Sequence, residues 1–109
     1  MLRRWYVGFR LARAIAANDH ERAVALLEAR LEKYPNELHT LTLLAQCHEA
    51  EGDLAQAMYF VNIVLTRSPY DEAALKIALR YYAVQRDHDR IYEYACRLLD
   101  FPQIGRAHV

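Results

Sequence analysis

Residues 39–69 read HTLTLLAQCHEAEGDLAQAMYFVNIVLTRSP, and this stretch decides the fold. Its first half places apolar residues such as Leu41 and Leu44 about one helical turn apart, which is the spacing of an amphipathic α-helix. Gly52 and Asp53 interrupt the pattern, because a glycine can take the left-handed conformation that ends one helix and an aspartate can cap the next. The apolar spacing then resumes until a Ser-Pro pair stops it, so the stretch predicts two helices joined by a tight turn.

The same unit recurs at a fixed period, because the interval from Asp19 to Asp53 equals the interval from Asp53 to Asp87. A recurring unit of this length, about 34 residues, is typical of helix–turn–helix repeats that stack on one another. The recurring residues are Asp19, Asp53 and Asp87 in the turn, Ala23 and Ala57 in the second helix, Leu31, Leu65 and Leu99 near its end, and Pro35 and Pro69 after it. We therefore predict an all-α protein of six antiparallel helices, at about 2–17, 20–34, 37–51, 54–67, 71–85 and 88–100.

The pattern also predicts which side chains are buried. Ala45 and Ala57 stand where the two helices of a pair approach most closely, since a larger side chain there would push the helix axes apart. We expect Leu44, Val61 and Leu65 to lie in the core beside them.

Charge and composition argue against several function classes. The 109 residues include 14 Lys and Arg and 14 Asp and Glu, so the chain lacks the basic surplus with which nucleic-acid binders neutralise phosphates. No apolar run approaches the roughly 18 residues that a membrane-spanning helix needs, and we expect a cytoplasmic protein. No phosphate-binding loop, metal motif or nucleophile motif occurs, so we expect no enzyme activity, no cofactor and no metal site.

The cysteines, histidines and tyrosines of the chain are interpreted as structural residues rather than as functional ones. Cys47 and Cys96 belong to no metal-binding pair, and we expect two reduced, partly buried thiols. His20 and His88 stand where helices begin. Four tyrosines are expected to pack between helices rather than stack on nucleic acid: Tyr81, Tyr82, Tyr92 and Tyr94.

The chain resembles the tetratricopeptide repeat family over roughly residues 4–102, with repeats at about 4–37, 38–71 and 72–103. The second repeat carries the family pattern in Leu41, Leu44, Ala45 and His48, then Ala57 and Val61, and then Pro69. The Sel1-like and half-a-tetratricopeptide families fit the repeat length less well. The resemblance implies a right-handed superhelix whose first helices line a concave groove that holds a peptide or helix of a partner protein.

Transferred to this chain, the resemblance implies a partner-binding groove formed by Trp5, His39, Thr42, Gln46, Glu49, Lys76 and Arg80. Trp5 has an alternative place in the core of the first helix, which its apolar periodicity favours. Lys76 and Arg80 lie four residues apart and can receive an acidic segment, although a solvated charged face fits them as well. The predicted function is a protein–protein interaction scaffold. The alternative is an accessory segment of a larger enzyme or of an assembly or secretion protein, with the chemistry outside this segment.

The C-terminal residues 104–109 do not match the repeat pattern. One reading frame of a common short-read sequencing adapter, ATC GGA AGA GCA CAC GTC, encodes these six residues, IGRAHV. We prefer that origin to a native frayed tail, and expect the chain to be a fragment of a longer protein. We also expect the third repeat to expose an apolar face through which the chain could associate with itself.

Overall fold

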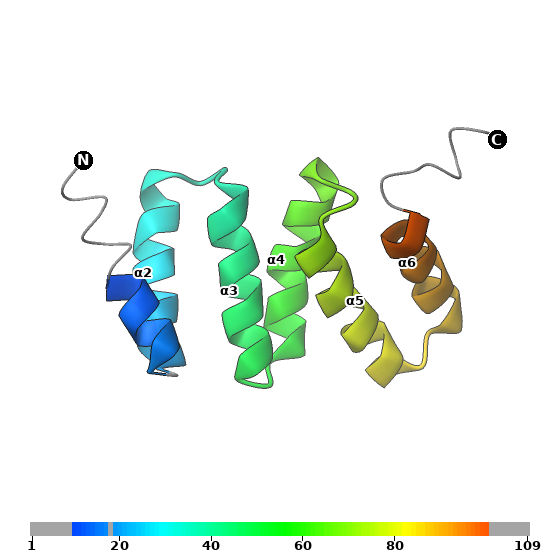
Figure 1. The fold of residues 1–109 in the computed structure, drawn as a ribbon, viewed down its shortest axis with the longest axis horizontal. Helices are drawn as coiled ribbons and strands as arrows, with labels where there is room; N and C mark the ends of the chain where they lie inside the picture. The colour runs from blue at the N-terminus through cyan, green and yellow to red at the C-terminus, as the bar shows by residue number, and fades with distance from the viewer. Residues whose placement is uncertain (1–9, 18, 101–109) are drawn as a thin grey trace.

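The computed structural model describes residues 10–17 and 19–100, and it is all-helical (Figure 1). Residues 10–16 are helical, and five further helices follow: α2 (His20–Lys33), α3 (Leu38–Ala50), α4 (Leu54–Arg67), α5 (Glu72–Gln85) and α6 (His88–Asp100). No strand occurs in these two ranges, which confirms the all-α prediction. The bounds of α2 to α6 agree with the predicted ones to within a residue. Trp5 and residues 104–109, on which predictions were made, lie outside the described residues.

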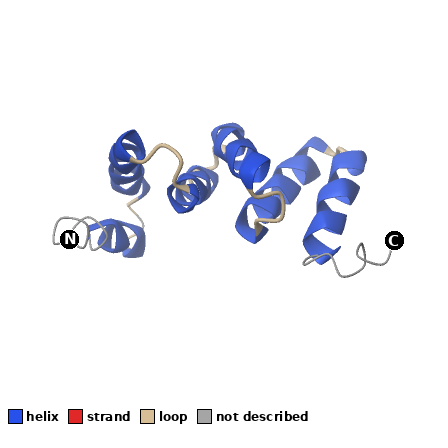
Figure 2. Ribbon diagram, turned by 90° about the horizontal axis from the view of Figure 1, so that it is seen from above, coloured by secondary structure: helices blue, strands red, loops and turns tan. Residues whose placement is uncertain are grey.

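Successive helices run antiparallel and stand side by side in a row (Figures 1 and 2). Each helix from α2 to α5 packs against the next one along the chain. The result is an elongated molecule with principal extents of 48 × 29 × 22 Å. Such an array buries its core between neighbouring helices rather than around one centre.

Each repeat turns at its aspartate, which serves both helices of the pair. The backbone N–H groups of Asp19, Asp53 and Asp87 donate to the carbonyls of Ala14, His48 and Tyr82, at 2.8, 2.9 and 3.1 Å, and so close the first helix. Their carboxylates accept from the backbone N–H groups of Arg22, Gln56 and Arg90, at 3.2, 3.1 and 3.2 Å, and so cap the second helix. A cap of this kind is worth about 1 kcal/mol. The recurrence of aspartate in every repeat is therefore explained by its carboxylate cap, since any residue except proline could donate the backbone bond.

The residue before this aspartate has a positive φ in two repeats. Gly52 has φ +87° and Arg86, at the same position of the next repeat, has φ +57°. Both follow a first helix and carry the chain into the turn. Glycine adopts this conformation freely, whereas arginine does so at a steric cost.

The predicted core residues are buried. Ala57, Leu44 and Val61 have no exposed surface, and Ala45 and Leu65 are also buried. Ala23, at the position of Ala57 in the first repeat, is fully buried too. Small side chains at this position fill little space between packed helices.

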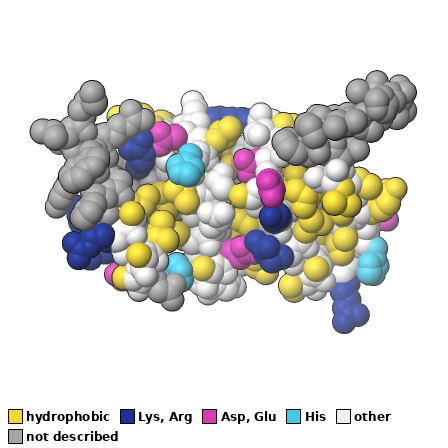
Figure 3. Space-filling model, viewed as in Figure 1, with side chains coloured by type: hydrophobic (Ala, Val, Ile, Leu, Met, Phe, Trp, Pro, Cys, Tyr) yellow, Lys and Arg dark blue, Asp and Glu magenta, His cyan; other side chains and the backbone are white. Residues whose placement is uncertain are grey.

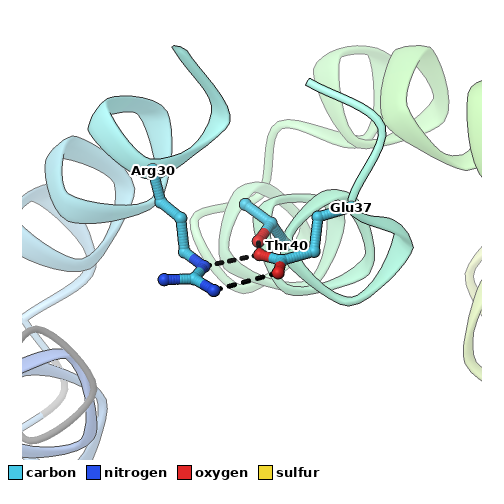
Figure 4. Close-up of polar contacts among 3 residues, drawn as sticks. All are labelled: Arg30, Glu37 and Thr40. Carbon is cyan, nitrogen blue, oxygen red and sulfur yellow. Dashed lines mark hydrogen bonds and ion pairs between the residues drawn. The ribbon is translucent and has the colours of Figure 1, made fainter. Parts of the chain in front are cut away.

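The helices α2 and α3 are joined by a polar cluster of Arg30, Glu37 and Thr40 (Figure 4). Glu37 precedes α3 but makes no side-chain cap. Its carboxylate instead accepts from the Arg30 guanidinium, with Nη2 to Oε2 at 2.9 Å, and from the hydroxyl of Thr40. Thr40 is buried, so this bond satisfies a hydroxyl that would otherwise be costly to remove from water.

Candidate functional site

The contacts between helices identify the inner side of the array. The first helices of two repeats, α3 and α5, touch each other, whereas the second helices α2, α4 and α6 do not contact one another. An array whose first helices are closer together than its second helices curves toward the first helices. We call the exposed side of α3 and α5 the inner face, and it is where the sequence places the groove.

Four of the predicted groove residues follow one stripe along α3. His39 and Gln46 are exposed, and Thr42 and Glu49 are half-buried. Their spacing of three and four residues keeps their side chains on one side of the helix. The structure therefore brings these four residues to one side of α3.

The other two described groove residues lie on α5. Lys76 and Arg80 are exposed and occupy the repeat positions of Thr42 and Gln46. The Lys76 ammonium pairs with Glu72 one turn earlier, with Nζ to Oε2 at 2.8 Å. The hydrogen bond from Lys76 lowers the pKa of the Glu72 carboxyl below its ordinary value. The i,i+4 spacing of Glu72 and Lys76 is the sequence signal that indicates this pair.

An ion pair joins the two halves of the inner face. The Arg80 guanidinium donates two hydrogen bonds to the Glu49 carboxylate, from Nε to Oε2 and from Nη2 to Oε1, the latter at 2.9 Å. This hydrogen bonding raises the pKa of Arg80. Glu49 of α3 and Arg80 of α5 are therefore in direct contact. Because Arg80 remains 57% exposed, the pair is accessible from solvent and contributes little to folding stability.

Positive and negative side chains lie beside one another on the molecular surface (Figure 3). Lys76 and Arg80 thus do not form an isolated basic patch, since each has an acidic partner within the array. A ligand that binds here meets two cations and two carboxylates.

The side chains of Cys47, His48 and Glu49 point to different environments although they are adjacent in sequence. Cys47 is buried, His48 stacks on Phe60 with ring centroids 5.7 Å apart, and Glu49 pairs with Arg80. Within residues 10–17 and 19–100, no group of three His, Cys, Asp or Glu side chains is arranged to hold a metal ion.

Two expectations on α6 are wrong. Tyr82 and Tyr94 do pack between helices, with ring centroids 5.4 Å apart, but Tyr92 is 74% exposed. Cys96 is likewise exposed rather than partly buried. Both residues lie on an exposed side of α6, and their apolar character alone did not show that no other described helix covers this side.

The cluster of Arg30, Glu37 and Thr40 was missed by sequence reasoning. Arg30 and Glu37 are seven residues apart across a turn, and no local pattern marks them as partners. Their role is to fix α3 against α2, and so to orient the inner face.

Comparison with known proteins agrees with this architecture. A family model described as tetratricopeptide repeat matches residues 14–80, which is more than half of the chain. No curated protein matches the chain. In the part of the chain that the structure describes, no helix combines the length and apolar character needed to cross a membrane. The matched range includes α3 and α5 as far as Arg80, and the chain belongs to the tetratricopeptide repeat family.

Proposed function

We propose that this chain is a non-catalytic scaffold whose inner face binds a peptide or helix of a partner protein. Tetratricopeptide repeats generally mediate protein–protein interactions and are typically not catalytic. The observations that support the site are the contact between α3 and α5 and the Glu49–Arg80 pair that joins the two helices.

The Glu49–Arg80 pair determines the chemistry that we propose for the partner. Arg80 has five N–H donors, and two of its nitrogens contact Glu49. Its exposed edge and the Lys76 ammonium, which is 50% exposed, can receive a carboxylate from the partner. We propose an acidic segment of a protein, held by Lys76 and Arg80 while Glu49 keeps the guanidinium in place, and we propose no nucleic-acid ligand.

The proposal is tested with peptides selected from a displayed random library on the immobilised chain. Affinities of the selected peptides are then measured by calorimetry for the wild type and for the double variant Lys76→Glu/Arg80→Glu. Because a charge-assisted hydrogen bond contributes about 1.5–3 kcal/mol, we expect at least a tenfold loss of affinity. Added salt should weaken wild-type binding as well.

The matched control is Arg22→Glu/Lys33→Glu, which makes the same change of charge on two exposed residues of α2, outside the inner face. This control should bind the selected peptides as the wild type does. Equal losses in both double variants would show a general charge effect, and unchanged affinity in Lys76→Glu/Arg80→Glu would remove both residues from the site.

A further inference from the structure

The inner face continues onto the first helix of the first repeat, residues 10–16. Ala12 is exposed and holds the repeat position of Gln46 on α3. Ile15 is also exposed, at 45%, and holds the repeat position of Glu49. Helices that recur at a fixed period present the same positions to the same side of an array. The inner face therefore spans three first helices, one from each repeat.

One edge of this face is apolar in every repeat. Ala16, Ala50 and Val84 share a repeat position in the last turn of the three first helices. All three are exposed, and Val84 keeps 68% of its surface exposed. The residue before this position is also apolar and exposed in the first and third repeats. We call this row the apolar edge, and it consists of Ile15, Ala16, Ala50, Ala83 and Val84.

The apolar edge borders the charged part of the inner face on α5. Val84 follows Arg80 by four residues, so their Cβ atoms lie about 5–6 Å apart on one side of the helix. A segment that sets a carboxylate on Arg80 therefore brings a nearby side chain of its own to Val84. On the side of the molecule that Figure 3 draws, hydrophobic side chains lie next to charged ones.

We propose that the partner segment carries two apolar residues besides its acid, and that it binds in an extended form across the three first helices. One apolar residue stands close to the acid and packs on Val84, and the other packs on Ile15. The small side chain of Ala50, between them, leaves room for the backbone of the segment. This inference rests on the proposed function, because it places the acid on Lys76 and Arg80.

The geometry of the array sets the spacing of the two apolar residues. The first helices α3 and α5 touch, and packed helix axes lie about 8–10 Å apart, so two such steps from α5 to the first repeat cover roughly 20 Å. An extended chain covers about 3.3 Å per residue, and the two apolar residues should therefore lie about six positions apart. An α-helical segment, with a rise of about 1.5 Å per residue, would need about thirteen positions.

Peptides selected from the random library on the wild-type chain test this arrangement. Those that lose affinity on Lys76→Glu/Arg80→Glu should share an acid with an apolar residue close to it, and a second apolar residue about six positions away. Ile15→Ser and Val84→Ser should each weaken their binding about fivefold, because each removes an apolar surface that the partner buries. Ile15→Val, which keeps most of that surface, should bind nearly as the wild type does. Circular dichroism checks that every variant keeps its helical content.

The control is Tyr59→Ser, which removes a side chain that is 60% exposed on α4, outside the inner face, and should leave the affinity unchanged. Peptides that depend on Lys76 and Arg80 but bind Ile15→Ser and Val84→Ser as tightly as the wild type would overturn this inference and leave the proposed function standing. A shared spacing near thirteen positions would overturn the extended form. Peptides that bind without any dependence on Lys76 and Arg80 would overturn the proposed function and this inference together.

Discussion

Gly52 and Arg86 occupy the same position of two repeats, and both have a positive φ, +87° and +57°. For a residue with a side chain, the left-handed conformation costs roughly 1–2 kcal/mol, because Cβ approaches the following carbonyl oxygen. Glycine avoids that cost but loses about 0.4–1 kcal/mol more in conformational entropy on folding. The difference between the two effects, about 0.5–1 kcal/mol, should favour glycine at both positions.

The two reciprocal substitutions should therefore change the free energy of unfolding in opposite directions. For Gly52→Ala, no heavy atom lies within 4 Å of the added Cβ, so the backbone alone sets a loss of about 0.5–1 kcal/mol. For Arg86→Gly, an exposed side chain is removed and the same difference becomes a gain of similar size.

Urea unfolding followed by far-ultraviolet circular dichroism measures both effects. The matched control is Gln85→Gly, one residue earlier, where the chain is still in α5 and glycine should cost about 1 kcal/mol. If Arg86→Gly destabilises the protein as much as Gln85→Gly does, the left-handed turn at Arg86 and the reasoning built on it are wrong.

Three further predictions follow from the core, the turn and the two thiols. Ala57→Trp should overpack the fully buried site and cost about 1–3 kcal/mol or more, whereas Ala55→Trp on the exposed side of α4 should melt nearly as the wild type does. Asp53→Ala should lower the free energy of unfolding by about 1 kcal/mol through the lost cap on the Gln56 N–H, and a thermal melt indistinguishable from wild type would contradict the role of that bond. Burial raises the pKa of the Cys47 thiol, so at neutral pH a maleimide should modify the exposed Cys96 and reach Cys47 only on unfolding; equal rates by mass spectrometry would argue against the burial.

Local signals predicted most of the fold. The helix bounds follow from short-range chemistry, since a cap such as Asp53 and a left-handed glycine such as Gly52 act within a few residues of themselves. The burial of Ala57 followed from the repeat period, which aligns every second helix with its neighbour. These features need no knowledge of residues distant in the chain.

Contacts between helices were harder to predict, as Glu37 and Asp71 show. The two acids hold the same repeat position before α3 and α5, yet Asp71 caps its helix through the Ala74 N–H at 2.9 Å and Glu37 does not cap. The longer side chain of Glu37 reaches Arg30 of the preceding helix instead. The repeat pattern predicts an acid at both positions, but the hydrogen-bond partner of each acid depends on the side chains of the neighbouring helix. The Glu49–Arg80 pair depends in the same way on the neighbouring helix, because its two side chains come from the first helices of successive repeats.

A comparison of Leu31, Leu65 and Leu99 shows how much of a side chain's burial depends on the neighbouring helix rather than on its own helix. They are the same residue at the same repeat position, yet Leu31 is half-buried, Leu65 is buried and Leu99 is 83% exposed. The helix that carries each leucine cannot account for this range, because the period and the turn are the same in all three repeats. What differs is the following first helix: α3 packs against α2 and α5 packs against α4, while no helix in the described part of the chain follows α6. Burial at this position is therefore supplied by the neighbour, and Leu99 with Tyr92 marks the surface where another first helix gains most by packing.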